Sequence, residues 1–457
     1  MASVAQRRSA LVAQLLGAFL LGAVAWALGY LVVAIHPLAP LALVVGVAGA
    51  VLGATHPFGL LLIFLAVLLT RPHDFYPALK ALQLAKLTAV GSLGLFVAGK
   101  MMRRDLSIAD APQVRWFGYL LGGVLVSVVL GTNRGFSFAF FKDVFVKIAI
   151  LYLLITNLVD SPKRAVIFQT AVALCTGYLG FYAYRAKLTG TADIEGSRAA
   201  FVGILGDPND LALTLLMSVF FCFAAWRRSR GPLRLFFFAL LFLHIAGLIA
   251  TQSRGGMLGL VAASYVFFKD RVKNKALVLA AVIGVGGLFL VAAGLKSRAT
   301  VSSDGIDASA QGRLDAWKAA GRMFVRSPAW GVGVEMFAWQ YPNYAWDAWD
   351  QRPKETHNMY LKALAETGLL GFVPFAMLLW LTWRSAGLLQ VRSSRAPPDS
   401  LERAVLESQQ ANLTGLLVSA FFLSQCWTWF PYILVGFVTA LERIYLQPAA
   451  DPEEVIV

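Results

Sequence analysis

Residues 233–250 read LRLFFFALLFLHIAGLIA, a run that is apolar except for Arg234 and His244. A helix of about 20 such residues crosses the roughly 30 Å hydrocarbon core of a membrane. Similar runs recur along the chain, which is 58% hydrophobic and only 14% charged. Soluble domains carry about 25% charged residues. The runs do not alternate apolar and polar residues, as the strands of a transmembrane barrel would. The sequence therefore predicts an all-α polytopic membrane protein.

The spacing of the runs predicts about 14 transmembrane helices, or about 12 if the short early segments do not cross the membrane. The first run, Leu11 to Ile35, follows Arg7 and Arg8 and is too long for a cleaved signal peptide, so we interpret it as a retained signal-anchor. The others are expected at 38–53, 57–70, 84–101, 115–131, 141–158, 164–184, 209–226, 233–250, 255–269, 275–295, 363–385, 409–427 and 430–447.

Basic residues gather in alternate loops. The positive-inside rule assigns those loops to the cytoplasm, and an even number of spans places both termini there too. This pattern accounts for the net charge of +15, so no nucleic-acid partner is expected. The opposite loops, which face the periplasm or cell exterior, are 71–83, 132–140, 185–208, 251–254 and 296–362.

The loop 296–362 is the longest of these and is punctuated by glycine and proline. Within it, Leu314–Val325 has helical periodicity, with Leu314, Trp317, Ala320, Met323 and Phe324 on one face. Trp330, Trp339, Trp346 and Trp349 would either stack on sugar rings or rest at the lipid interface.

His357 lies at the end of this loop, in Glu355-Thr356-His357-Asn358, just before an apolar span. The positive end of a helix dipole lowers the pKa of an imidazole, which suits a general base. The alternative is that Thr356 or Asn358 caps the helix and His357 is only a polar interface residue. Spacing alone does not separate the two interpretations.

Arg254 lies in Thr251-Gln252-Ser253-Arg254-Gly255-Gly256, a tight turn in an outer loop. Its guanidinium could bind a diphosphate through two parallel hydrogen bonds, or it could simply reach the lipid interface. In another outer loop, Arg198 precedes Gly206-Asp207-Pro208-Asn209-Asp210. There, Asp207 or Asn209 is expected to cap a helix that has Pro208 in its first turn.

Metal and cofactor motifs are not found in the sequence. Cys175, Cys222 and Cys426 all fall inside apolar runs, and no His, Cys and carboxylate cluster has metal-ligand spacing. No glycine-rich phosphate loop appears. We therefore expect chemistry without a metal or other cofactor.

Taken together, these segments resemble the O-antigen ligase and O-antigen polymerase superfamily of bacterial envelope glycosyltransferases. The resemblance covers about residues 190–375. It rests on Gly206-Asp207-Pro208-Asn209-Asp210-Leu211-Ala212, Ser253-Arg254-Gly255-Gly256, Gly312-Arg313-Leu314…Trp317, Pro328…Gly331-Val332-Gly333 and Thr356-His357-Asn358-Met359-Tyr360-Leu361…Leu364-Ala365-Glu366-Thr367-Gly368-Leu369-Leu370-Gly371.

The resemblance implies a GT-C-like, multi-pass enzyme of the bacterial inner membrane with its active site in the periplasm. Such an enzyme transfers a glycan from an undecaprenyl-diphosphate carrier to a hydroxyl of lipid A–core, with inversion. The family's histidine maps to His357 as general base, and its two arginines map to Arg254 and Arg198 on the diphosphate. Arg313, Asn358, Trp346 and Trp349 are candidate substrate contacts, and Glu366 is expected to support the loop.

These motifs do not separate a ligase from a polymerase that joins repeat units, or from a ligase that glycosylates a protein. A flippase or secondary transporter is a remote alternative, because no inverted repeat or mid-span charge network is found. The chain is interpreted as one transmembrane glycosyltransferase domain, residues 1–457, in which 296–362 forms a lid.

Overall fold

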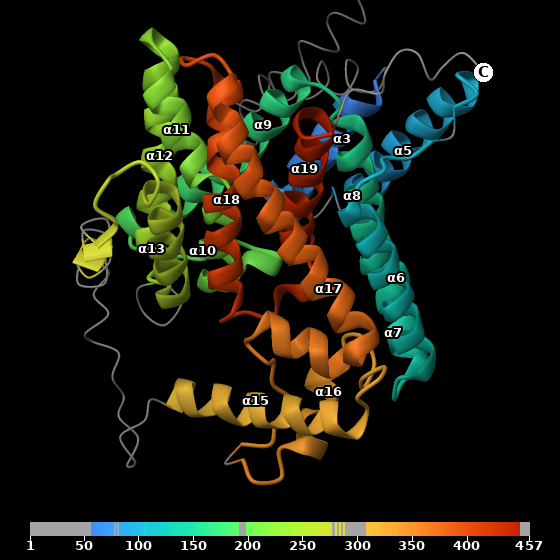
Figure 1. Ribbon diagram of the computed structural model, residues 1–457. Coiled ribbons are helices and arrows are strands. Elements are labelled where there is room, and N and C mark those ends of the chain that lie inside the picture. The colour runs from blue at the N-terminus through green and yellow to red at the C-terminus, as the bar shows by residue number, and fades with distance from the viewer. Residues whose placement is uncertain are drawn as a thin grey trace, which may run out of the picture.

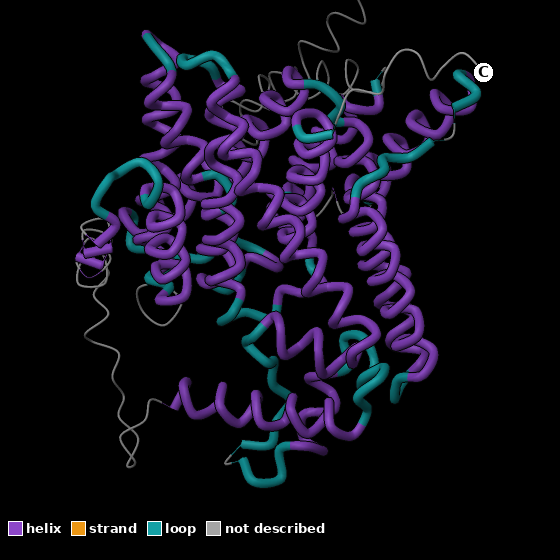
Figure 2. Tube along the Cα trace, in the orientation of Figure 1, coloured by secondary structure: helices purple, strands orange, loops and turns teal. Residues whose placement is uncertain are grey.

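The computed structural model describes residues 56–447, except for short gaps at 77–78, 80–81, 106, 192–197 and 349 and a break over 277–307 in which only a few residues are described. The expected signal-anchor, the span at 38–53, most of the span at 275–295, the start of the long loop and Trp349 lie outside the described residues. Every regular element in the described part is a helix (Figure 2).

Six helices are long and apolar enough to cross a membrane, which confirms a polytopic membrane protein within the described ranges. Two shorter apolar helices accompany them, α3 (Pro57–Thr70) and α13 (Arg254–Phe268). The six are α5 (Leu84–Met102), α6 (Pro112–Leu130), α9 (Pro162–Leu188), α10 with α11 (Pro208–Leu216 and Val219–Arg228), α12 (Gly231–Thr251) and α17 (Met359–Arg392), which continues to Arg395.

The remaining helices complete a bundle and an appendage at one end of it. In the bundle, α7 (Arg134–Phe140) and a π-helical turn at Phe141–Phe145 lead into α8 (Val146–Leu158), and α18 (Leu401–Ala420) and α19 (Trp429–Tyr445) follow α17. The appendage consists of α15 (Ala308–Arg326) and α16 (Phe337–Tyr344). Figure 1 shows α15 lying across the lower end of the bundle, beside the first turns of α17.

One expected span is misplaced. The sequence predicted a helix at 409–427, but α18 covers Leu401–Ala420 and a short 3-10 turn, η6, follows at Gln425–Trp427. The helix starts early because the Ser400 hydroxyl accepts a hydrogen bond from the Arg403 amide and so caps it. Its first turns hold polar residues such as Glu407 and Gln409, which are buried against neighbouring helices and therefore do not interrupt it.

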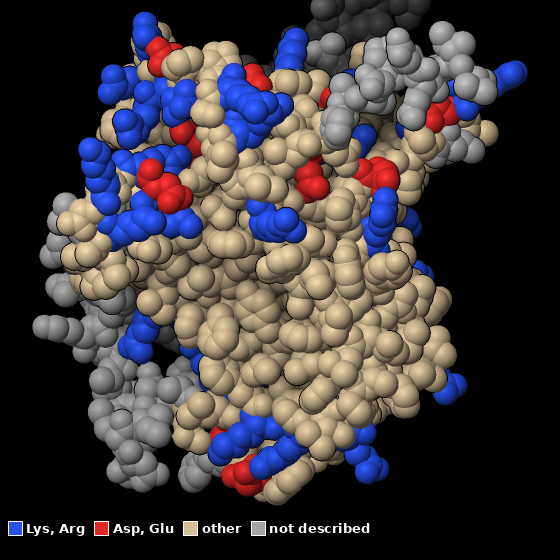
Figure 3. Space-filling view, viewed as in Figure 1, with Lys and Arg blue, Asp and Glu red and all other residues tan. Residues whose placement is uncertain are grey.

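The expected outer loops gather at one end of the bundle. Phe75 packs on Phe201 with ring centroids 5.1 Å apart, the Ala199 amide donates to the Ala250 carbonyl at 3.0 Å, and the Thr132 amide donates to the Val332 carbonyl at 2.9 Å. The first two contacts join loop 185–208 to loop 71–83 and to the end of α12, and the third joins loop 132–140 to the long loop 296–362. Figure 3 shows charged side chains at both ends of the molecule with a largely uncharged band between them. Lys and Arg predominate at the upper end of this view, opposite the end where the outer loops lie.

Candidate functional site

His357 is the residue before the N-cap of α17. The Asn358 side chain accepts hydrogen bonds from the Tyr360 and Leu361 amides, both at 3.0 Å, and this cap starts the helix. His357 itself has a φ of 46°, in the left-handed region that residues other than glycine seldom adopt. The chain therefore turns sharply at His357 before it enters the bundle.

Two distant segments hold this turn in place. The Ser424 hydroxyl accepts the His357 amide at 3.0 Å and lies 3.0 Å from the Thr356 hydroxyl. From α15, the Trp317 indole donates to the Thr356 carbonyl at 3.0 Å. The role of Ser424 could not be predicted from the sequence, because no motif marks a residue whose partner is 67 positions away.

The imidazole of His357 is half-buried, and its pKa lies below the ordinary histidine value. Burial is the largest cause, and the positive charge of Arg313 on α15 adds to it, while Asp207 and Glu355 act in the opposite direction. His357 is therefore neutral near pH 7 and able to accept a proton. Arg313 and Asp207, which come from separate segments, thus act on the charge of the same imidazole.

A buried ion-pair cluster stands beside His357. The Lys362 ammonium is almost fully buried and lies 3.0 Å from carboxylate oxygens of both Glu335 and Glu355. Burial would raise the pKa of Glu355, but the charge and hydrogen bond of Lys362 outweigh it, so the pKa is lowered. Lys362 thus ties the segment before His357 to the loop after α15, a link that sequence analysis did not predict.

Arg198 and the Arg254 turn are joined through Asn209. Arg198 is only 8% exposed, and it donates to the Thr251 carbonyl at 3.1 Å and to the Asn209 side-chain oxygen at 2.9 Å. The Ser253 hydroxyl donates to the same Asn209 oxygen at 2.7 Å and caps α13 by accepting the Gly256 amide. Arg198 therefore braces the turn from beneath, and Arg254, the first residue of α13, projects an exposed side chain from it.

The loop before α10 joins the same end. Asp207 caps α10 by accepting the Asn209 amide at 2.7 Å, and Pro208 occupies the first turn, as predicted. Asp210 accepts a hydrogen bond from Gln425, which follows Ser424. Residues 424 and 425 thus connect the His357 segment with the segment that holds Arg198 and Arg254.

The long loop is fastened to α17 by backbone contacts. The Val332 and Gly333 amides donate to the carbonyls of Ala365 and Glu366 at 3.0 and 3.1 Å. The Glu366 carboxylate in turn accepts the Glu335 and Phe337 amides at 3.0 and 2.9 Å, which confirms the structural role expected of it. This loop docks tightly on the bundle.

The other candidates fall into different surroundings. Arg313 lies on α15, and Asn358 uses its side-chain oxygen as a cap. Trp346 is 63% exposed, and the guanidinium carbon of Arg322 lies over its ring, 4.1 Å from the ring centroid. The face predicted for α15 is wrong in part. Leu314 is 42% exposed, and alanines such as Ala316 form the buried side instead, because small residues let α15 approach its neighbours closely.

Residues 239–376 match the model of a protein family described as O-antigen ligase. The chain contains an O-antigen ligase domain. The resemblance inferred from the motifs is therefore confirmed at family level. No match was found among curated proteins. The O-antigen ligase domain includes the Arg254 turn, α15, the docked loop and His357, whereas Arg198, Asp207 and Ser424 come from flanking segments.

Proposed function

We propose that the chain is an O-antigen ligase that transfers a glycan from undecaprenyl diphosphate to a sugar hydroxyl of lipid A–core. The observation that carries this proposal is that a neutral, rigidly held His357 and the exposed Arg254 lie at the same end of a membrane-spanning bundle, in segments joined through residues 424 and 425. The family match supports the reaction class. The whole chain would act as one domain in which 296–362 forms part of the site.

His357 is the proposed general base. Its imidazole takes the proton of the acceptor hydroxyl while that oxygen attacks the anomeric carbon of the donor sugar. The bond from the anomeric carbon to the phosphate oxygen breaks, and undecaprenyl diphosphate leaves with the electron pair. Attack on the face opposite the leaving group inverts the anomeric centre.

Charge on the departing diphosphate needs cations that are already in place. Arg254 is exposed at the tip of a braced turn, which suits two parallel hydrogen bonds to phosphate oxygens. Arg198 adds a second positive charge from beneath the turn. Arg313, near His357, is the candidate for a further phosphate or sugar contact, and Trp346 and Trp349 for the glycan.

The proposal places the site in the periplasm of a bacterium, with the chain in the inner membrane. The end of the bundle opposite His357 carries most of the lysines and arginines in Figure 3. Basic loops stay in the cytoplasm, so that end, and both termini of a chain with an even number of spans, would be cytoplasmic.

A strain that lacks the gene tests the acceptor. We expect its lipopolysaccharide gel to lose the polymer ladder from lipid A–core while carrier-linked polymer accumulates. A gel that shows cores capped by single repeats would identify a polymerase instead. An unchanged gel together with an unglycosylated envelope protein would identify a protein ligase, which uses the same donor.

Arg254→Lys should lower transfer by about 10²-fold, because lysine keeps the charge but loses the planar fork that binds two phosphate oxygens. Turnover of the undecaprenyl-diphosphate donor in proteoliposomes measures this. Arg326→Lys, at the exposed end of α15, is the matched control and should retain full activity. If Arg254→Lys turns over at the wild-type rate, Arg254 serves only as an anchor of the turn.

A further inference from the structure

A polar cavity of about 700 Å³ opens at the other end of the bundle. Its walls come from the C-terminal ends of α11, α13 and α17 and from the first turns of α18. His357 and Arg254 lie at the opposite ends of α17 and α13. Along α13 alone, the 15 residues of the helix separate the cavity from Arg254 by about 20 Å. The cavity is therefore separate from the proposed catalytic site.

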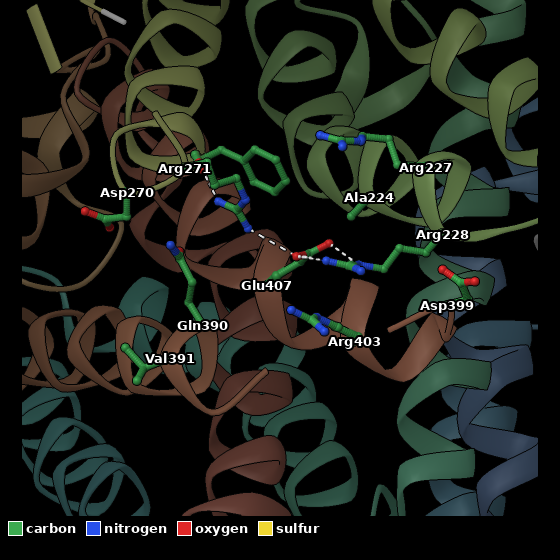
Figure 4. A pocket seen from close by; sticks show the side chains of 11 residues that line it. Ala224, Arg227, Arg228, Asp270, Arg271, Gln390, Val391, Asp399, Arg403 and Glu407 are labelled. Carbon is green, nitrogen blue, oxygen red and sulfur yellow. Dashed lines mark hydrogen bonds and ion pairs between the residues drawn. The ribbon is translucent and has the colours of Figure 1, made fainter. Parts of the chain in front are cut away.

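A buried carboxylate organises the arginines of this cavity. The Glu407 side chain is only 7% exposed and receives two hydrogen bonds from Arg228, at 2.6 and 2.7 Å. Arg271 approaches the same carboxylate at 3.3 Å. Figure 4 shows Arg228 and Arg271 reaching Glu407 from opposite sides, with Arg403 beside it. Glu407 thus holds two arginines in fixed positions.

Two other polar atoms of the wall lack partners. The Arg403 Nε atom and the Gln390 Oε1 atom are both buried, and neither has a hydrogen-bond partner. An unpaired polar atom in a buried position costs free energy, because it has lost its hydrogen bonds to water. A ligand that lowers this cost would offer an acceptor to Arg403 and a donor to Gln390.

The net charge of the wall is positive. It contains four arginines, Arg227, Arg228, Arg271 and Arg403, against three carboxylates, Asp270, Asp399 and Glu407, which leaves one net positive charge. Asp399 is moreover ion-paired with Arg230, which lies outside the wall. The charge of the wall therefore favours an anionic ligand.

We propose that this cavity binds the headgroup of an acidic phospholipid with a glycerol headgroup, such as phosphatidylglycerol. The phosphate would accept hydrogen bonds from Arg403 and Arg227, and a glycerol hydroxyl would donate to Gln390. Basic pockets between transmembrane helices bind lipid headgroups of this kind. The cavity lies at the ends of membrane-spanning helices, where a headgroup is available and its acyl chains can remain in the bilayer.

The test is titration of the purified full chain with phosphatidylglycerol, read by native mass spectrometry. We expect specific retention of phosphatidylglycerol over phosphatidylcholine, which has no net charge and no hydroxyl donor. The double variant Arg227→Gln/Arg403→Gln should bind phosphatidylglycerol about 10-fold more weakly or worse, because each arginine makes a charge-assisted hydrogen bond. The matched control Arg392→Gln/Arg395→Gln removes the same charge at the same end, outside the cavity wall, and should bind normally.

Wild-type retention in the Arg227→Gln/Arg403→Gln variant would overturn the proposal. So would displacement of the lipid by millimolar inorganic phosphate, since the site would then take a soluble phosphate anion. Thermal unfolding in phosphatidylcholine alone should give the same midpoint for the variant and the wild type, which separates lost binding from lost folding. The readout is lipid binding, so its outcome does not depend on whether the chain transfers glycans.

Discussion

His357→Asn should lower glycan transfer by about 10²- to 10⁴-fold, the usual contribution of a general base. Asparagine tolerates the left-handed backbone that His357 adopts at a φ of 46°, so the turn before α17 is kept. The hydrogen bond from the backbone amide of residue 357 to the Ser424 hydroxyl is kept as well. Asparagine has no basic nitrogen, so only the proton acceptor is removed. The measurement is the rate of transfer from the undecaprenyl-diphosphate donor in proteoliposomes, with the thermal unfolding midpoint as a check on folding.

The pH profile distinguishes a base from a merely structural histidine. Activity should fall on the acid side as His357 becomes protonated, and the position of this limb reports its pKa. Arg313→Gln removes a positive charge that lowers the pKa, so the limb should move to higher pH. Asp207→Asn removes a negative charge that raises the pKa, so the limb should move to lower pH, and asparagine still caps α10. Wild-type turnover by His357→Asn, or a limb that stays in place in both charge variants, would contradict the general-base role.

The sequence predicted those features of the fold that depend on local composition. Apolar runs placed most of the described spans within a few residues, as 233–250 against Gly231–Thr251 illustrates. The alternation of basic loops predicted which loops share a side, and contacts such as that of Thr132 with Val332 confirm it. Capping residues were also predictable, because Asp207-Pro208 acts within one turn of its own helix.

Features that depend on distant contacts were not predictable. Ser424 and Trp317 hold the His357 segment, yet neither residue type marks such a role in the sequence. Lys362 sits in an apolar stretch and is tolerated there because two carboxylates surround it. The early start of α18 was missed for a related reason, since hydropathy alone cannot show that Glu407 is neutralised by Arg228.

The long loop is more firmly attached than a lid that opens freely. Besides its bonds to α17, it is held by Thr132, in the turn between α6 and α7, and by the Ser137 hydroxyl of α7, which donates to the Val334 carbonyl at 2.9 Å. Helix α6 can approach because it carries Gly123, where a Cβ atom would lie 2.3 Å from the Leu370 carbonyl oxygen. The loop itself approaches α17 at Gly331, where a Cβ atom would lie 2.3 Å from the Glu366 carbonyl carbon, so both contacts with α17 depend on residues without side chains.

Gly368→Ala should therefore disrupt the site from a distance. Gly368 kinks α17 with a φ of 55° and a ψ of −159°, a conformation that only glycine adopts readily. An added Cβ atom would lie 2.5 Å from the Ala329 carbonyl carbon, and backbone at that point cannot move aside without breaking the 2.8 Å bond from the Leu369 amide to the Pro328 carbonyl. Strain and overlap together should cost about 2–4 kcal/mol.

We expect Gly368→Ala to lose most glycan transfer, because undocking the loop withdraws Trp317 and Arg313 from the His357 segment. Faster proteolysis after the lysines and arginines of residues 313–354 and a lower unfolding midpoint would report the undocking directly. Gly321→Ala is the matched control, since its Cβ atom meets nothing within 4 Å on α15 and alanine favours a helix by about 1 kcal/mol. If Gly368→Ala kept full activity with its loop protected, docking on α17 would not be what positions His357.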